Sequence, residues 1–434
     1  MAIAAPNTST TATAPGTGQS YSAPLATVTT LFFMWGFLTC LNDILVPHLK
    51  SIFDLGYAEV MLIQFAFFGA YFIFSIPSAR MIDWIGYQRS MVLGLLTMGL
   101  GAFLFVPAAS VPSFPLFLGA LIVLAAGITC LQVAANPYVT VLGKPETASS
   151  RLNLTQAFNS LGTFLAPFFG GLLILSAAPK TMNEIRAMAP DALQAYRLHE
   201  AATVKTPYVG LGIALVLLAV AIGSFKLPKI EHAQHKVGEK VNDSIWRHPN
   251  LIFGAIAIFV YVGGEVAIGS FLVNYFGQPE IGGLTEKVAA SFVAFYWGGA
   301  MVGRFIGSAL LQKMSTGRLL GICAICAGAL VAISMLTTGH TAMYSIILVG
   351  FFNSIMFPSI FTLGVAELGP LTGDGSGVMI MAIVGGAIIP VAQGAIADRI
   401  GIHHAFFLPV ICYLYILFFA LSGSKPNSQR YAKV

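Results

Sequence analysis

Apolar stretches long enough to cross a membrane recur along the whole chain, separated by short polar or glycine-rich breaks. A spanning helix needs about 20 predominantly apolar residues, so the pattern predicts twelve transmembrane helices. Their predicted spans are residues 25–50, 58–82, 89–109, 113–142, 150–176, 206–226, 250–277, 287–312, 317–337, 340–366, 375–398 and 403–422. The expected fold class is therefore an all-α polytopic membrane protein.

Polar stretches divide these helices into two groups of six. Residues 1–22 are mostly Ala, Thr, Ser, Pro and Gly without a charge, which predicts a disordered tail and not a targeting peptide. One polar insert, 180–205, separates the fifth and sixth spans, and a second, 226–247, separates the sixth and seventh. The predicted organisation is a tail (1–22), an N-terminal half (23–226), a cytoplasmic linker (227–248), a C-terminal half (249–422) and a C-terminal tail (423–434).

Composition and charge agree with this interpretation. Hydrophobic residues make up 57% of the 434 residues and charged residues only 9%, whereas soluble domains carry roughly 25% charged residues. The net charge of +5 is spread among the predicted loops, so it indicates membrane topology and no nucleic-acid partner. Most Lys and Arg fall on one side when both termini are placed in the cytoplasm, as the positive-inside rule requires. The five cysteines lie in apolar segments without a metal-binding pattern.

The two halves repeat a pattern of glycine and proline inside their helices. Paired halves with interrupted helices are typical of transporters that bind their substrate between the halves, near the middle of the membrane. The matched pairs are Pro137–Gly143 in the fourth span with Pro358–Gly364 in the tenth, and Gly162–Pro167 in the fifth with Gly385–Pro390 in the eleventh.

Two carboxylates, Asp43 and Glu265, lie well inside predicted spans of different halves. A carboxylate at the bilayer centre costs about 2.5–3.5 kcal/mol on insertion scales, so each is expected to face a wet cavity. Burial raises the affinity of a carboxylate for a proton, and nearby carbonyls would instead allow sodium binding. We therefore predict cation coupling at Asp43 and Glu265. The structural alternative for each is a polar contact that locks two helices together.

Amide side chains are the second polar group at membrane depth. Gln132 and Asn136 are four residues apart and Gln156 and Asn159 three apart, so each pair shares one helix face. Amides offer both donors and acceptors, as a polyhydroxylated ligand requires, and aromatic rings can cover its apolar faces. Interhelical hydrogen bonding and lipid contact are the structural alternatives. The predicted binding residues are Asn42, Gln132, Asn136, Gln156, Asn159, Glu265, Asn353, Trp35, Tyr261 and Trp297.

Charged residues near the predicted cytoplasmic helix ends are candidates for a gate. Asp83 and Arg89 lie in the expected short loop after the second span, and Arg304 is the corresponding cation of the second half. Surface solvation is the alternative for all three. We find neither a phosphate-binding glycine loop nor a nucleophilic triad, so the sequence predicts neither ATP-driven transport nor an enzyme.

At the level of whole motifs, the chain resembles the major facilitator superfamily, and within it the fucose/glucose–galactose sugar symporters. The loop at Asp83 is similar to the superfamily's charged cytoplasmic motif but lacks its usual first glycine. The other segments that carry the resemblance are Trp35-Gly-Phe, Asn42-Asp-Ile-Leu, Leu131 to Gly143, Arg151 to Ser160, Phe352 to Ser359 and Gly385 to Pro390.

This resemblance implies a cation-coupled monosaccharide importer that works by alternating access. In the fucose branch, a first-helix aspartate matching Asp43 is linked to proton coupling, and fifth-helix amides matching Gln156 and Asn159 contact the sugar. A fourth-helix glutamate of that branch falls at Gln132 here, while Glu265 appears in the seventh span. The departure resembles the glucose/galactose branch and leaves both proton and sodium open as the coupling ion.

The predicted function is therefore cation-coupled import of glucose or galactose across a bacterial inner membrane. Alternatives are an L-fucose:proton symporter and, more distantly, a drug/proton antiporter, whose pocket is expected to be more apolar. We expect a monomer, because each chain encloses its own pathway, and no cofactor other than the coupling ion.

Overall fold

A computed structural model describes residues 21–53, 57–111, 113–173, 187–228 and 243–426 of the chain. At 39–53, 57–62, 64, 167–173, 200–201 and 286 it describes the backbone alone. The predicted tails and most of the predicted linker lie outside the described residues. The division of the chain at these points therefore remains a prediction.

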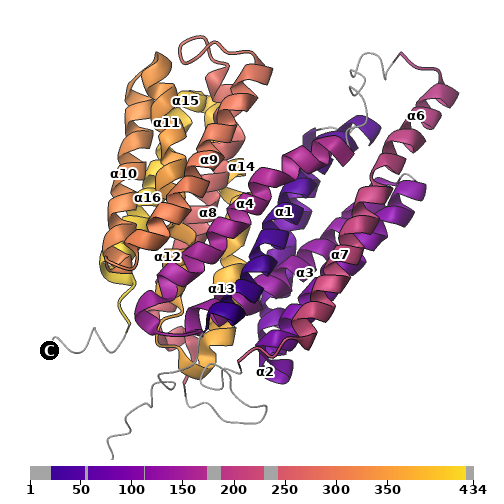
Figure 1. Cartoon of the computed structure of the whole chain (residues 1–434). Coiled ribbons are helices and arrows are strands. Elements are labelled where there is room, and N and C mark those ends of the chain that lie inside the picture. Colours follow the sequence, from indigo (N-terminus) through magenta and orange to yellow (C-terminus); the bar gives the residue numbers. More distant parts are fainter. Residues whose placement is uncertain (1–20, 54–56, 112, 174–186, 229–242, 427–434) are drawn as a thin grey trace, which may run out of the picture.

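The N-terminal half is built from long helices that run back and forth through the bundle (Figure 1). They are apolar along most of their length, as helices in hydrocarbon must be. Their bounds are α1 Ser22–Phe53, α2 Tyr57–Ser110, α3 Phe114–Val141, η1 Pro145–Thr147, α4 Ala148–Leu173, α6 Pro190–Thr203 and α7 Lys205–Ser224.

The C-terminal half has the same plan but more interruptions. Its bounds are η3 Ile245–Arg247, α8 Pro249–Phe276, α9 Glu286–Leu310, α10 Thr316–Leu336, α11 Gly339–Asn353, α12 Met356–Gly364, η4 Gly369–Leu371, α13 Thr372–Met381, η5 Ala382–Val384, α14 Gly385–Ile400, α15 Ile402–Ala405, α16 Phe407–Phe418 and η6 Phe419–Gly423. Among the described residues, the helices give the predicted twelve spans when the short polar helix α6 is left out, α2 is counted as two, and α11–α12, α13–α14 and α15–η6 are counted as one each. The all-α fold is confirmed.

The chain turns at Gly86, between the second and third predicted spans. Helical structure continues from Tyr57 to Ser110, and only Gly86 has non-helical dihedral angles inside it (φ 82°, ψ 167°). That region of backbone space is open essentially to glycine alone. The short loop predicted around Asp83 and Arg89 is therefore a tight turn made at Gly86. The insert predicted at 180–205 also contains a helix, α6, rich in exposed polar side chains.

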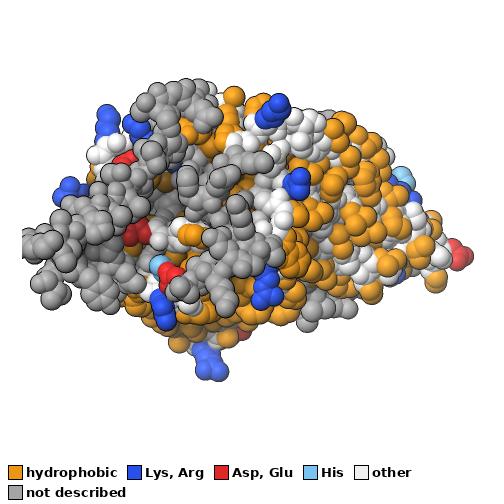
Figure 2. Space-filling model, turned by 90° about the horizontal axis from the view of Figure 1, so that it is seen from below, with side chains coloured by type: hydrophobic (Ala, Val, Ile, Leu, Met, Phe, Trp, Pro, Cys, Tyr) orange, Lys and Arg blue, Asp and Glu red, His pale blue; other side chains and the backbone are white. Residues whose placement is uncertain are grey.

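The beginning of α1 and the end of η6 lie at the same end of the bundle, here called the terminal end (lower end in Figure 1). Helices of the two halves approach each other there and diverge toward the opposite end. Seen from the terminal end, hydrophobic side chains gather in the right-hand and lower parts of the view, and the charged groups in view are mostly Lys and Arg (Figure 2). Hydrogen bonds join the halves at this end: Ser149 Oγ lies 2.6 Å from Thr362 Oγ1, and Ser150 Oγ donates to the Ser308 carbonyl at 2.8 Å.

At helix ends, side chains donate hydrogen bonds to the backbone carbonyls that lack a partner within the helix. The Arg151 guanidinium, on α4, donates to the carbonyls of Val139, Thr140 and Lys144 around the end of α3. Asn250 Nδ2, at the start of α8, reaches the carbonyls of Leu363, Gly364 and Ala366 around the end of α12, at 3.3, 3.1 and 3.0 Å. Lipid supplies no donor to such groups, so the protein must supply its own.

We predict that Gly86→Ala lowers the free energy of unfolding by about 1–3 kcal/mol, because a Cβ is strained at this backbone conformation. Thermal denaturation in detergent, followed by fluorescence-detected size exclusion, measures the change. Gly119→Ala is the matched control, since Gly119 is helical and nothing lies within 4 Å of an added Cβ. Equal melting temperatures for the two variants would contradict the assignment.

Candidate binding site between the two halves

The N-terminal half contributes a layer of buried amides on α3. Gln132, with 1% of its surface exposed, donates from Nε2 to the Tyr71 hydroxyl of α2 at 2.7 Å. Trp35 of α1 is also hydrogen-bonded to Tyr71. Since the indole nitrogen can only donate, the Tyr71 oxygen accepts from both neighbours. Three helices are thereby joined at one phenolic oxygen, and Gln132 Oε1 is left without a partner among the described residues.

Two further amides of this half have buried atoms without a protein partner. Asn136 is fully buried, one helical turn from Gln132, and neither of its amide atoms is hydrogen-bonded within the described part of the chain. Gln156 on α4, 4% exposed, has an unpaired Nε2 in that same region. A buried unsatisfied polar group costs about 1–3 kcal/mol. Amides kept in this state between helices indicate a place for a hydrogen-bonding ligand.

Asn159 lies on the same helix but is engaged with the protein. Its Nδ2 donates to the Phe32 carbonyl of α1 at 2.9 Å. A Cβ added at Gly36 would lie 2.1 Å from the Asn159 carbonyl oxygen, so α1 and α4 touch backbone to backbone there. Asn159 therefore ties two helices together, which the sequence considered as its structural alternative.

The C-terminal half holds a connected network around Asn353. The Tyr261 hydroxyl lies 2.8 Å from Glu265 Oε1 and 3.1 Å from the Asn353 carbonyl oxygen. Asn353 Nδ2 donates to the Tyr296 hydroxyl at 2.9 Å, and its Oδ1 accepts from the Tyr413 hydroxyl at 2.8 Å. Glu265 remains half-buried, whereas Tyr261 and Asn353 are almost completely buried. Glu265 is thus the member of this network that is open to a small ligand.

A proline explains why the network forms at this point. Pro358 has no N–H, so the carbonyl of Ser354 loses its intrahelical donor, and the helix breaks between α11 and α12. Arg304 Nε donates to that carbonyl at 3.2 Å, while Tyr261 occupies the neighbouring carbonyl of Asn353. The glycine/proline pattern therefore located an interruption in the tenth span, as the sequence predicted.

Arg304 lies between the halves and contacts both. Arg304 belongs to α9. Its Nη1 donates to the Gln156 carbonyl at 3.3 Å and to the Ser160 hydroxyl, and both of these groups belong to α4. Asn153 Nδ2 returns a bond to the Arg304 carbonyl at 2.6 Å. The guanidinium also acts electrostatically on Glu265. A planar five-donor group can serve several acceptors at once, and here it joins the carboxylate network of one half to the amide helix of the other.

Asp83 and Arg89 are the other two gating candidates. Asp83 Oδ1 is 3.8 Å from the position that a Cβ on Gly373 would take, in the first turn of α13. A carboxylate is favoured near a helix N-terminus, so Asp83 sits where the two halves meet at the terminal end. Arg89 is exposed. The role of these three residues as a gate remains a prediction.

The aromatic candidates differ in what they present. Trp35 and Trp297 keep part of their surface exposed, and Trp297 packs against Gly269, one turn along α8 from Glu265. Tyr261 is 1% exposed, so its ring offers no open face to a ligand, and its hydroxyl positions Glu265 instead. Sequence reasoning missed Tyr413 and Ser160 as partners in these networks; no local pattern distinguishes them from neighbouring residues of their helices.

Asn42 and Asp43 lie on α1, in the part of the helix whose side chains are outside the described residues. Their predicted roles therefore stay predictions. The backbone of α1 carries them toward the end of the bundle opposite to Ser22 (Figure 1).

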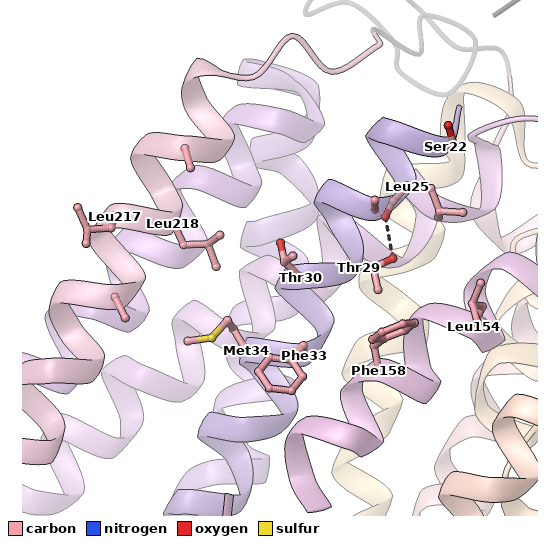
Figure 3. Close-up of a pocket in the computed structure, with 13 residues that line it drawn as sticks. Ser22, Leu25, Thr29, Thr30, Phe33, Met34, Leu154, Phe158, Leu217 and Leu218 are labelled. Carbon is pink, nitrogen blue, oxygen red and sulfur yellow. Dashed lines mark hydrogen bonds between the residues drawn. The ribbon is translucent and has the colours of Figure 1, made fainter. Parts of the chain in front are cut away.

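A cavity of about 910 Å³ lies elsewhere, between α1, α4 and α7 of the N-terminal half (Figure 3). The Thr29 hydroxyl there donates to the Leu25 carbonyl of its own helix at 2.7 Å, which leaves an apolar wall. Because only one half lines it, relative motion of the halves cannot expose it alternately to two sides. It contains none of the predicted binding residues. Side chains in its wall include Phe33, Met34, Leu154, Phe158, Leu217 and Leu218.

Twelve helices in two interrupted halves, with polar networks meeting between them, define a secondary transporter fold. Residues 27–383 match the family model described as Major Facilitator Superfamily. The chain belongs to this superfamily.

Relatives that match over nearly the whole chain carry the names of sugar transporters. The "Glucose/galactose transporter" of Brucella abortus is 52% identical over 426 residues, which cover 98% of this chain and 100% of the relative. The "L-fucose-proton symporter" of Escherichia coli K12 is 37% identical, with 94% and 95% covered. The crystal structure of FucP in the outward conformation matches with a TM-score of 0.87 at 35% identity, covering 94% of this chain and 100% of that one. The family assigned from the sequence is confirmed.

We predict that Arg304→Lys disrupts transport and lowers the free energy of unfolding by about 1–3 kcal/mol, because an ammonium cannot reproduce the fork that reaches both helices. Uptake by reconstituted protein and thermal denaturation measure the two effects. Arg318→Lys, the same change at an exposed position of α10, is the control. Normal uptake by Arg304→Lys would show that transport does not require the contacts of the Arg304 guanidinium with α4.

Proposed function

We propose that the protein imports a monosaccharide, glucose or galactose, by cation-coupled alternating access. The observation that carries the proposal is Arg304, which lies between the halves of a transporter fold. It contacts α4, the helix of Gln156, and acts electrostatically on Glu265 of the other half. The full-length similarity to a protein named glucose/galactose transporter supports the choice of sugar.

In this proposal the two halves hold different parts of the ligand. Gln132, Asn136 and Gln156 supply amide donors and acceptors to sugar hydroxyls. Trp35 and Trp297, which keep exposed surface, cover apolar sugar faces. Glu265 accepts a hydrogen bond from a sugar hydroxyl or binds the coupling cation, because a carboxylate forms charge-assisted hydrogen bonds. Tyr261 already holds one of its oxygens in place.

The coupling ion is a proton or sodium, with Asp43 and Glu265 as the carboxylates that take it up. The two lie in different halves, so binding of the cation can be sensed by both. We further propose a bacterial inner-membrane location with the terminal end in the cytoplasm, in keeping with the basic residues at that end. The described state is then closed to the cytoplasm, and one chain forms a complete pathway.

An L-fucose:proton symporter is the second candidate. It is favoured by the 37% identity to a named L-fucose-proton symporter and by the TM-score of 0.87 to FucP. The sequence argument against it is Gln132, which stands where the fucose branch has a glutamate. A drug antiporter is expected to have a more apolar pocket than the amides and the carboxylate between the halves provide, so that alternative is not proposed.

The test is uptake of labelled D-glucose by proteoliposomes under an imposed proton gradient or sodium gradient. We expect accumulation with one gradient only, and competition by unlabelled galactose stronger than by fucose. Asp43→Asn is expected to abolish accumulation while leaving glucose exchange, because exchange moves no net charge. Absence of uptake under either gradient by folded protein would overturn the glucose proposal, and fucose uptake would then support the second candidate.

Gln156→Ala and Asn159→Ala are predicted to differ, because only Gln156 has an unpaired amide nitrogen. Gln156→Ala should raise the half-saturation concentration for sugar roughly tenfold or more with a small change in melting temperature, since about 1.4 kcal/mol of lost binding corresponds to tenfold. Asn159→Ala should lower the melting temperature, because it removes the bond to the Phe32 carbonyl. Unchanged half-saturation in Gln156→Ala would remove that residue from the site.

A further inference from the structure

Proline 137 leaves a carbonyl of α3 without its normal partner. In a continuous helix, the N–H of residue 137 would donate to the carbonyl of Val133, but proline has no N–H. Val133 is fully buried, so water does not replace the missing donor. The bond comes instead from Ser376 Oγ, on α13 of the other half, at 2.9 Å. Ser376 is also fully buried.

The approach of α13 that permits this bond depends on the next residue. A Cβ added at Gly377 would lie 2.7 Å from Ala79 Cβ and 3.2 Å from the Ser75 carbonyl oxygen of α2. Small residues let transmembrane helices approach to backbone contact. The hydroxyl of Ser376 is thereby held against α3 while Gly377 is seated on α2, so one turn of α13 docks onto two helices of the N-terminal half.

This contact differs from the other hydrogen bonds that join the halves at the terminal end. The hydroxyls of Ser150 and Ser308 each reach the other residue's carbonyl. When the halves separate, serine hydroxyls can turn back to the backbone of their own helices. The Val133 carbonyl has no such alternative, because its intrahelical donor is missing. Its bond exists only while the two halves are together.

We propose that the Val133 carbonyl, freed by Pro137, and the Ser376 hydroxyl form a latch that holds the cytoplasmic end closed. The latch makes Pro137 and Ser376 positioning residues for the transport cycle. It favours the described state over the state in which the halves separate at this end. The proposal rests on alternating access from the proposed function and not on the identity of the sugar.

The test measures the two states directly, without transport. Spin labels are placed at Lys226→Cys and Lys313→Cys, exposed positions of the two halves near the terminal end, after the five native cysteines are replaced by alanine. Distances are recorded by double electron–electron resonance on the full chain in lipid nanodiscs. Opening of the cytoplasmic end converts the short distance into a longer one.

Ser376→Ala removes the donor, and Pro137→Ala gives the Val133 carbonyl a donor within its own helix. Each is expected to raise the ratio of long to short distances about two- to tenfold, the range for loss of one net hydrogen bond. The double variant should do no more than the larger single change, since both act on one bond. Ser345→Ala is the control: Ser345 is a buried serine that bonds only its own helix, and the ratio should stay unchanged.

A ratio in Ser376→Ala equal to that of the control would overturn the latch. If Ser376→Ala does not fold, Pro137→Ala decides, and an unchanged ratio in that variant overturns the latch equally. Because no sugar is added, the outcome is independent of the uptake experiment. A shifted ratio in a protein that takes up no glucose would support the latch and reject the proposed substrate.

Discussion

Hydrocarbon offers no partner to a backbone carbonyl, and this constraint organises the interior of the molecule. Pro137 and Pro358 each remove one N–H from a spanning helix, and in both cases a side chain of another helix donates to the carbonyl that loses it. Pro358 releases a carbonyl that Arg304 takes, and Pro137 releases one that Ser376 takes. The prolines thereby specify where polar side chains of neighbouring helices must converge. Part of the polar interface between the halves, the bond of Ser376 to the Val133 carbonyl, follows directly from such a deficit.

The two halves meet this constraint in different ways, although their proline patterns match. In the C-terminal half, tyrosines and Asn353 satisfy one another, and a single carboxylate stays partly open. In the N-terminal half, Gln132, Asn136 and Gln156 retain atoms without a partner among the described residues, as Gln393 does in the other half. An amide can turn to suit several hydroxyl geometries, whereas a fixed tyrosine network holds one arrangement. Under the proposed function, the amides of the N-terminal half adjust to the ligand, and the tyrosine network of the C-terminal half holds the Glu265 carboxylate in one position.

Much of this could be predicted from the sequence, because the signals are local. Length and hydropathy determine the spans, and a proline inside an apolar run marks a break whatever surrounds it. The contacts of Arg304 could not be predicted, since its partners Gln156 and Ser160 lie on a different half and no spacing rule relates them. The short charged loop predicted between the second and third spans is a turn at Gly86, whose backbone angles no sequence pattern specifies. Tyr413 was missed because a buried tyrosine looks like its apolar neighbours until its hydroxyl is located.

The clamp made by Arg151 has a mechanical consequence. Its guanidinium holds the end of α3 and the connection that follows, while the residue itself belongs to α4. The fourth and fifth spans therefore cannot bend independently at this joint, and they act as one stiff lever. Ser149 and Ser150 at the terminal end belong to the same helix as Gln156, so a displacement at these serines acts on the helix that carries this amide. Bending of the transporter must then occur at other helix connections, where no side chain joins the end of one helix to the start of the next.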